Sequence, residues 1–85
     1  MNSSGRDQSS TAAIQAGLAL AGWNVSDLWV AAVATGGGFN HADIKSIASG
    51  QRAATPTEHD ILAAALNDHF VDRGQDHPVR CWLDL

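Results

Sequence analysis

Residues 26–70 read SDLWVAAVATGGGFNHADIKSIASGQRAATPTEHDILAAALNDHF, and this stretch decides the fold. Its apolar residues recur at helical spacing in three blocks. Capping residues stand before each block and glycines follow the first two: Ser26, Asn40 and Thr55 suit helix starts, and Gly36 and Gly50 suit helix ends. The stretch therefore predicts three consecutive helices joined by short loops.

The first two of these helices differ in how they distribute apolar side chains. In the second, residues 40–49, one face is expected to bury Ile44, Ile47 and Ala48 and the opposite face to present Lys45, Ser46 and Ser49. In the first, a stripe of Trp29 and Val33 stands beside a stripe of Leu28, Ala31, Ala32 and Thr35. Because this helix is apolar over a wide arc, it is either wedged centrally or carries a patch for a partner.

The third helix, residues 56–70, has the strongest start signal. Thr55, Pro56 and Glu58 combine a capping residue, a proline at the first helical position and a glutamate that completes a capping box. Its inward face is expected to hold Ile61, Leu62, Ala65, Leu66 and Phe70, with Asp60, Asn67 and Asp68 away from it.

Upstream of this stretch, residues 1–9 are polar and offer nothing to bury, so they are predicted to form a disordered arm. A further helix is expected over residues 11–21, capped by Ser10 or Thr11 and ended by Gly22. Gly17 lies inside it. Glycine weakens a helix by roughly 1 kcal/mol relative to alanine, so Gly17 is either closely packed by another element or merely tolerated.

Downstream, residues 71–85 form a predicted tail beyond the helical domain of residues 10–70. After Pro78, apolar and polar side chains alternate, which is typical of extended chain: Val79, Cys81, Leu83 and Leu85 against Arg80, Trp82 and Asp84. A single strand cannot pair its own backbone. The tail is therefore expected to pair with a second copy, lie on the helices or remain loose.

Composition bounds the class of protein. The chain has 85 residues, of which 45% are hydrophobic and 16% charged, so one small domain with a core is expected. The lone Cys81 cannot close an internal disulfide, which favours a reducing compartment. No apolar run reaches the roughly 20 residues of a membrane span, and no signal-peptide pattern opens the chain, so we expect a cytoplasmic protein that is not membrane-bound.

The formal net charge is −4, and it is unevenly distributed. Acids exceed bases by one in residues 1–35, bases exceed acids by one in residues 36–55, and acids exceed bases by four in residues 56–85. The helix over residues 40–49 and its following loop are therefore the least acidic part of the chain.

No pattern predicts catalysis, a metal or a cofactor. The four histidines have no metal-ligand spacing and are expected at the surface: His41, His59, His69 and His77. The triple glycine of residues 36–38 lacks the Gly-Lys-Ser/Thr that would make it a phosphate loop. No nucleophile signature joins a serine, a histidine and an aspartate, so the chain is not expected to be an enzyme.

Residues 26–70 resemble the lambda-repressor-like and Cro-like helix-turn-helix domains. Ala32 matches the small residue of the first motif helix and Gly36 the turn glycine, while Ile44 and Ile47 match the paired aliphatics of the second helix. The loop of residues 49–55 and the helix after it also fit that family. The spacing from Ala32 to Ile44 is two residues longer than the usual motif, which Gly37 and Gly38 would absorb as a lengthened turn.

The resemblance implies an all-α bundle of four helices that contains a helix-turn-helix, and a small transcriptional regulator that binds duplex DNA as a homodimer. The second motif helix and the loop after it would read the DNA. The residues so implied are Asn40, His41, Ala42, Lys45, Ser46, Ser49, Gln51 and Arg52.

A second hypothesis keeps the same scaffold for a different task. The shortage of basic residues and the acidic last third suit an adaptor or inhibitor that binds a protein partner. Its contact residues would be the exposed aromatic and aliphatic side chains of the first motif helix and the tail, namely Trp29, Val33, Trp82 and Leu83.

Overall fold

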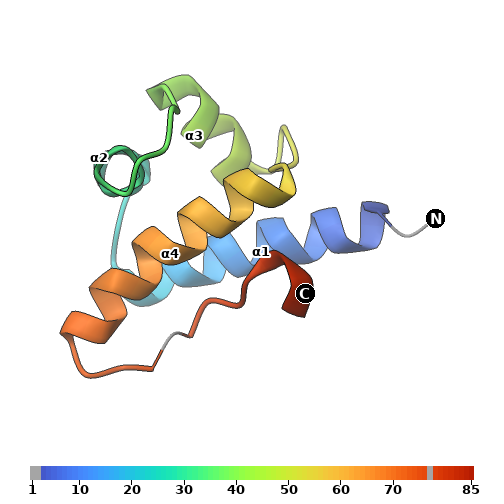
Figure 1. Cartoon of the computed structure of the whole chain (residues 1–85). Coiled ribbons are helices and arrows are strands. Elements are labelled where there is room, and N and C mark those ends of the chain that lie inside the picture. Colours follow the sequence, from blue (N-terminus) through green and yellow to red (C-terminus); the bar gives the residue numbers. More distant parts are fainter. Residues whose placement is uncertain (1–2, 77) are drawn as a thin grey trace.

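Four α-helices and one short 3-10 helix make up the computed structural model, which describes residues 3–76 and 78–85 (Figure 1). The elements in chain order are α1 (Ser3–Ala21), α2 (Val25–Ala34), α3 (His41–Ser49), α4 (Pro56–Asp72) and η1 (Trp82–Asp84). The described residues contain no strand. The prediction of an all-α fold is confirmed.

The helices of the deciding stretch begin and end close to the predicted residues. Asn40 caps α3 in a capping box with Asp43, and Thr55 caps α4 in a capping box with Glu58, as expected for Thr55. The cap of α2 was predicted wrongly, because Asn24 and not Ser26 fills it. Asn24 stands three residues before Asp27, so the two form a reciprocal capping box, which Ser26 with Trp29 three residues later could not make.

The glycine-rich connection between α2 and α3 is a tight turn followed by a buried anchor. Gly36 has a φ of 102°, an angle that favours glycine, and the amide of Gly37 donates to the carbonyl of Ala32 over 2.9 Å. Phe39 is then buried in the core. A Cβ at Gly37 would meet the Phe39 ring at 2.7 Å, so this position has no room for a side chain.

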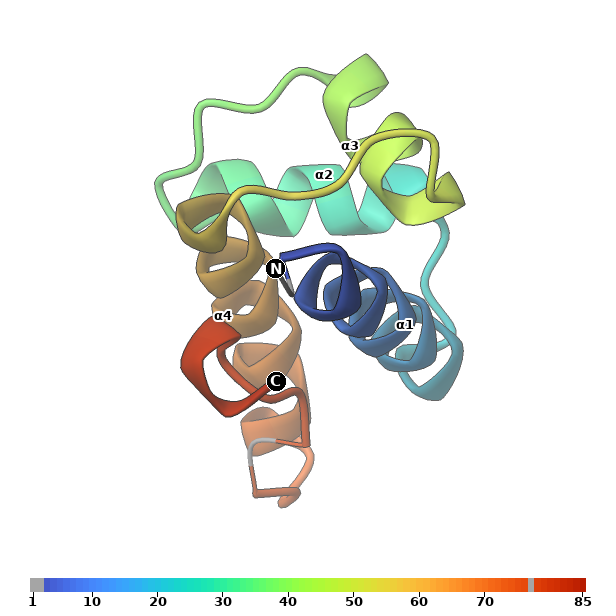
Figure 2. The same ribbon diagram turned by 90° about the vertical axis from the view of Figure 1, so that its right-hand side faces the viewer.

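The core lies between the four α-helices. α4 packs against α1 and α2, and α3 packs against α1 and α2 (Figures 1 and 2). Its buried side chains come from the four α-helices, from the loops on either side of α3 and from the tail: Ile14, Leu28, Ala32, Phe39, Ile44, Ile47, Ala54, Leu62, Ala63, Leu66, Phe70 and Val79. The buried face predicted for α3 is confirmed, and so is that of α4 except that Ile61 is only half-buried.

Gly17 lets another element approach α1 closely, the first of the two readings above. A Cβ there would meet Leu66 Cδ1 at 2.9 Å and Val79 Cγ2 at 3.0 Å. Both neighbours are themselves buried, so neither side chain can move aside freely. Because Gly17 has no side chain, both α4 and the tail can pack closely against α1.

The predicted disordered arm is wrong for residues 3–9, which belong to α1, while residues 1 and 2 lie outside the described chain. Ser10 and Thr11 are therefore inside the helix and cap nothing. The segment has a partner that the sequence did not reveal, since the Arg6 guanidinium lies 5.8 Å from the centre of the Trp82 ring. Ser10, which follows the segment directly, is fully buried.

The predicted extended tail is also corrected. α4 continues to Asp72, and the chain then returns along the helices and ends in η1 (Figure 1). Asn67 holds this return: its amide donates to the Val79 carbonyl over 2.8 Å, and its carbonyl accepts from the Val79 amide over 2.9 Å. Of the alternating apolar residues only Val79 is buried, and Leu83 is 80% exposed. The tail lies on the helices because Asn67 supplies the backbone partners that a second strand would have supplied.

No single helix of the described chain is both long and apolar enough to cross a membrane, and one pair bent by 102°, residues 5–21 with α2, passes that test of length and composition.

Candidate functional site

The eight residues expected to read DNA do lie together, on α3, its cap and the loop after it, but several are engaged within the chain. Asn40 accepts from the amide of Asp43, His41 Nε2 lies 3.1 Å from Ser26 Oγ, and Ser49 Oγ donates to the Ser46 carbonyl. Ala42, Lys45 and Gln51 are exposed and Ser46 is half-buried. The outward positions predicted for α3 are thus outward, with Ser46 only partly so.

Arg52 is paired with a carboxylate of α4, so its guanidinium is not free to contact a DNA phosphate. Its guanidinium donates to both carboxylate oxygens of Glu58, over 2.9 and 3.2 Å, and lies 3.9 Å from Asp43. The hydrogen bond to Glu58 raises the pKa of Arg52, and the hydrogen bonds from Arg52 lower the pKa of Glu58. Bidentate pairing of this kind fixes the planar guanidinium in place.

Lys45 is therefore the one cation of the predicted reading face that makes no ion pair in the described chain. Each phosphate contact contributes to DNA affinity through released counterions, so a face with one such cation contributes little. Within the described chain, the predicted reading face thus carries little unpaired positive charge.

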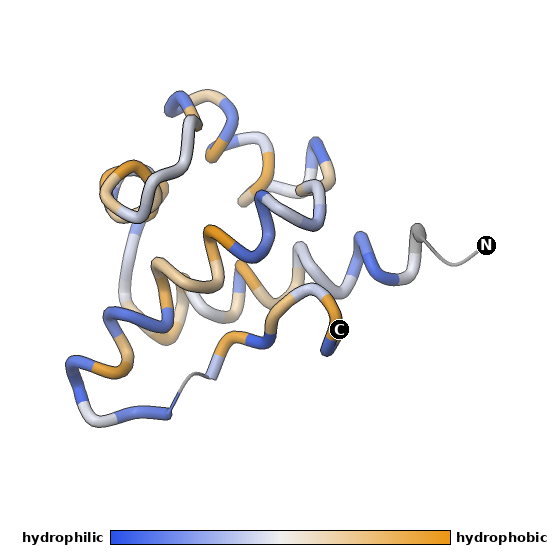
Figure 3. Tube along the Cα trace, viewed as in Figure 1, coloured by the Kyte–Doolittle hydropathy of each residue, from blue (hydrophilic) through white to orange (hydrophobic). Residues whose placement is uncertain are grey.

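The outer face of α2 has the opposite character, since it is apolar and uncovered. Val30 and Val33 are 62% and 48% exposed, and with Trp29 they line a shallow hollow of about 140 Å³. Trp29 is half-buried and its indole Nε1 donates to the Phe39 carbonyl over 3.1 Å, which turns its polar atom inward. In Figure 3, α2 is seen end-on and is coloured hydrophobic around most of its turn. We call Trp29, Val30 and Val33 the α2 face.

The four residues predicted for a protein contact fall at two separate places. Trp29 and Val33 lie on α2, whereas Trp82 and Leu83 lie on η1, which packs against α4 well away from α2 (Figures 1 and 2). The Trp82 ring is half-buried 6.0 Å from the His59 ring, and its backbone amide donates to Asp60 over 2.7 Å. Trp82 thus packs onto its own helices, and Leu83 beside it stays exposed.

A buried polar chain joins α1, α4 and the tail. Ser10 Oγ lies 2.7 Å from Nδ1 of His59, and Nε2 of His59 lies 2.8 Å from the carbonyl oxygen of Arg80. Because a carbonyl only accepts, Nε2 is the donor, and in the neutral ring Nδ1 accepts from the Ser10 hydroxyl. Ser10 and His59 are both 0% exposed, so no substrate reaches this pair and its effect is structural.

The prediction that the histidines lie at the surface is therefore wrong for His59. It holds for His41, which is exposed, and His69 is half-buried, while His77 lies outside the described residues. His59 was expected at the surface for lack of metal-ligand spacing, but Ser10 of α1 and the returning tail cover it. The described residues contain no group of three histidine, cysteine or acidic side chains able to hold a metal ion.

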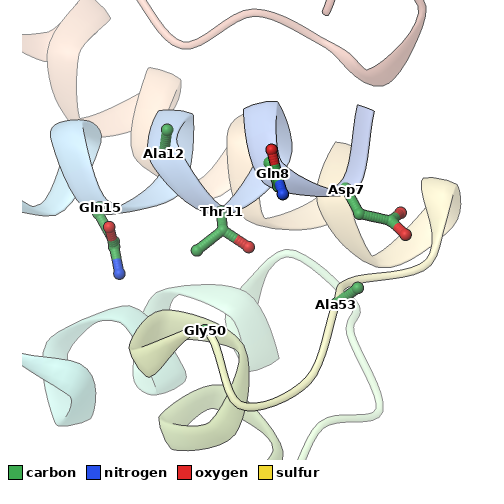
Figure 4. Close-up of a pocket in the computed structure, with 7 residues that line it drawn as sticks. All are labelled: Asp7, Gln8, Thr11, Ala12, Gln15, Gly50 and Ala53. Carbon is green, nitrogen blue, oxygen red and sulfur yellow. The ribbon is translucent and has the colours of Figure 1, made fainter. Parts of the chain in front are cut away.

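Another opening lies between α1 and the loop from α3 to α4. It is a shallow groove of about 290 Å³ with mostly small side chains (Figure 4). The Gln15 amide donates to the Ala48 carbonyl over 2.9 Å, so this polar group is already used. In the described chain no buried side-chain nitrogen or oxygen lacks a hydrogen-bond partner, so none points into this groove awaiting a ligand. Its lining is Asp7, Gln8, Thr11, Ala12, Gln15, Gly50 and Ala53.

Sequence reasoning missed Val30, the most exposed member of the α2 face. The apolar stripes were assigned by helical spacing, and Val30 belongs to neither stripe, so it was not counted. Its signal was available, because a valine outside both stripes of an amphipathic helix must point outward.

No protein-family model matches the chain, and comparisons with curated proteins and with solved structures likewise give no match.

Proposed function

We propose that this protein is a protein-binding module that docks a partner on the α2 face. The observation that carries the proposal is the exposure of Val30 and Val33 beside the ring of Trp29. Contiguous apolar surface of this kind, with an aromatic side chain in it, is typical of protein contacts. An amphipathic helix is the fitting partner, because side chains at helical spacing on one helix form the ridge that another helix receives.

Charge favours a different protein over a second copy as the partner. Each copy of the chain carries a formal net charge of −4, so two copies repel each other. The α2 face itself holds no charged side chain. A neutral or basic partner meets no such repulsion. The molecular mass of the protein in solution tests whether it self-associates.

The test is a selection of displayed random peptides against the protein, followed by binding to two variants. Val30→Ser combined with Val33→Ser removes the apolar contact, and Leu20→Ser removes an equally exposed apolar side chain from α1. We expect the selected peptides to bind the α2 variant at least about tenfold more weakly and the Leu20 variant unchanged.

Two outcomes would contradict the proposal. One is a set of enriched peptides that bind the α2 variant as tightly as the unaltered protein. The other is the absence of any enriched peptide. Sedimentation equilibrium tests the remaining alternative, a second copy of the chain on the α2 face. A dimer that the unaltered protein forms and the α2 variant does not form would identify a second copy as the occupant.

DNA binding by α3 is the second candidate, favoured by the exposed Lys45 among small and polar neighbours on a well-capped helix. As part of this second candidate, we propose that α2 and α3 form a helix-turn-helix. Binding to random duplex DNA should appear at low salt and weaken steeply as salt rises. Lys45→Glu should abolish it while Arg73→Glu, an equal change of charge at the end of α4, should not. Absence of binding at low salt would exclude this candidate.

A further inference from the structure

A second groove opens beside the α2 face, between the last turns of α2 and the second half of α4. Its volume is about 340 Å³, within the range of about 300–1,000 Å³ of small-ligand sites. Ala34 lines it and lies one helical turn from Val30, so the groove continues the α2 face. The lining residues are Trp23, Ala31, Ala34, Thr35, Ala65, Asp68, His69 and Asp72.

Negative charge gathers in this groove without an internal counterion. Asp68 and Asp72 stand one turn apart on α4, both are exposed, and neither makes an ion pair in the described chain, even with the adjacent Arg73. The C-terminal end of α2 adds the negative end of a helix dipole, and its last turn contains no basic residue. No lysine or arginine lines the groove.

An aromatic wall completes the groove. The ring of Trp23 lies 4.8 Å from the ring of His69 at an angle of 52°, and both rings line the opening. The face of an indole attracts cations, and it attracts a planar guanidinium most readily because the two can stack. A carboxylate pair beside an aromatic face therefore matches an organic cation, and the described residues offer no three-ligand set for a metal ion.

We propose that this groove receives an arginine side chain of the partner that docks on the α2 face. The inference rests on the proposed function and specifies it: the partner carries an apolar anchor for Val30 and Val33 and an arginine about one helical turn away. The guanidinium stacks on Trp23 while its N–H groups donate to the carboxylates of Asp68 and Asp72. The acidity of the chain's last third then serves recognition of a basic partner.

The groove is tested alone with a small probe, N-acetyl-arginine amide, which carries one guanidinium and neutral ends. Its uncharged isostere, N-acetyl-citrulline amide, is the matched control. We expect saturable changes in the amide and indole NMR signals of Trp23, Thr35 and the segment 68–72 with the arginine probe. The citrulline probe should bind with an affinity at least about tenfold weaker.

Protein variants distinguish the groove from general electrostatics. Asp68→Asn with Asp72→Asn should weaken binding of the arginine probe at least about tenfold. Asp7→Asn with Asp84→Asn removes the same charge from α1 and η1 and should leave binding unchanged. Equal binding of both probes, signal changes scattered over many acidic residues, or equal loss in both double variants would overturn the proposal.

The peptides selected on the α2 face supply the final comparison. Replacing their arginines by citrulline should weaken binding at least about tenfold to the unaltered protein and have no effect with the Asp68 and Asp72 double variant. Peptides that depend on Val30 and Val33 but ignore this replacement would overturn the arginine site and leave the proposed function standing. If the arginine probe binds in the groove but no peptide depends on the α2 face, the proposed function would be overturned and the arginine site would stand.

Discussion

Two regions of the molecule reverse the usual placement of side chains. Where the tail crosses α1 and α4, Ser10 and His59 are buried and Asn67 is half-buried, and all three side chains are hydrogen-bonded. On the α2 face, Val30 and Val33 are uncovered. The first region buries polar groups because each finds a hydrogen-bond partner, and the second exposes apolar groups because no element of the chain lies over them. We infer that the first region stabilises the fold and that the second is available to bind a partner.

Among the polar side chains, the largest effect on stability is expected at His59. Replacing it by alanine leaves a cavity and strips the partners from Ser10 and the Arg80 carbonyl, so we expect a loss of about 3–4 kcal/mol in the free energy of unfolding. Urea denaturation measures it. His69→Ala on the same helix removes a half-buried ring with no hydrogen bond and should cost about 1 kcal/mol. Equal losses would show that the buried chain of hydrogen bonds has no special weight.

A smaller loss is expected at Asn67, which holds the tail. Asn67→Ala removes both hydrogen bonds to the Val79 backbone and should lower the free energy of unfolding by about 2 kcal/mol. Amide hydrogen exchange in residues 78–85 should accelerate as well. Asp68→Ala, the next position and exposed, is the control and should do neither. An unchanged exchange rate in the tail would mean that other contacts hold it.

The ion pair of Arg52 and Glu58 predicts a dependence on pH. The pKa of Glu58 is lowered in the folded state, so its contribution is present above the ordinary carboxyl pKa of 4.5 and is lost as the pH falls through the lowered value. Glu58→Gln should therefore reduce stability by about 1 kcal/mol near neutral pH and by less at about pH 3. Urea denaturation at both pH values checks this, and a gap that widens on acidification would contradict it.

The smallest effect on stability is expected on the α2 face. Val30→Ser and Val33→Ser should each change the free energy of unfolding by no more than about 0.5 kcal/mol, because both residues are already exposed to water. Leu28→Ala on the same helix is fully buried and should cost about 2–5 kcal/mol. A large loss of stability for either valine would mean that the α2 face stabilises the fold, and it would remove the argument that this face binds a partner.

Much of the fold was predictable because its signals are local. The caps at Asn40 and Thr55 and the helix ends at Gly36 and Gly50 depend on residues within one turn of each other. The cap of α2 was missed although its signal, Asn24 followed by Asp27, was equally local. The candidate DNA residues lie on α3, its cap and the loop after it, and their role stays a prediction. The pairing of Arg52 with Glu58 depends on how the loop folds back onto α4.

The sequence by itself determined where α2, α3 and α4 lie and which side of α3 and α4 is buried, because propensity, caps and apolar spacing act over a few residues. Only the tertiary structure decided that residues 3–9 are helical, that the tail returns over His59, and that Val30 and Val33 remain uncovered. These outcomes join positions far apart in the chain: Ser10 and His59 are separated by 49 residues. Whether a polar side chain finds a partner, or an apolar one a cover, is decided by such contacts and not by the neighbours along the sequence.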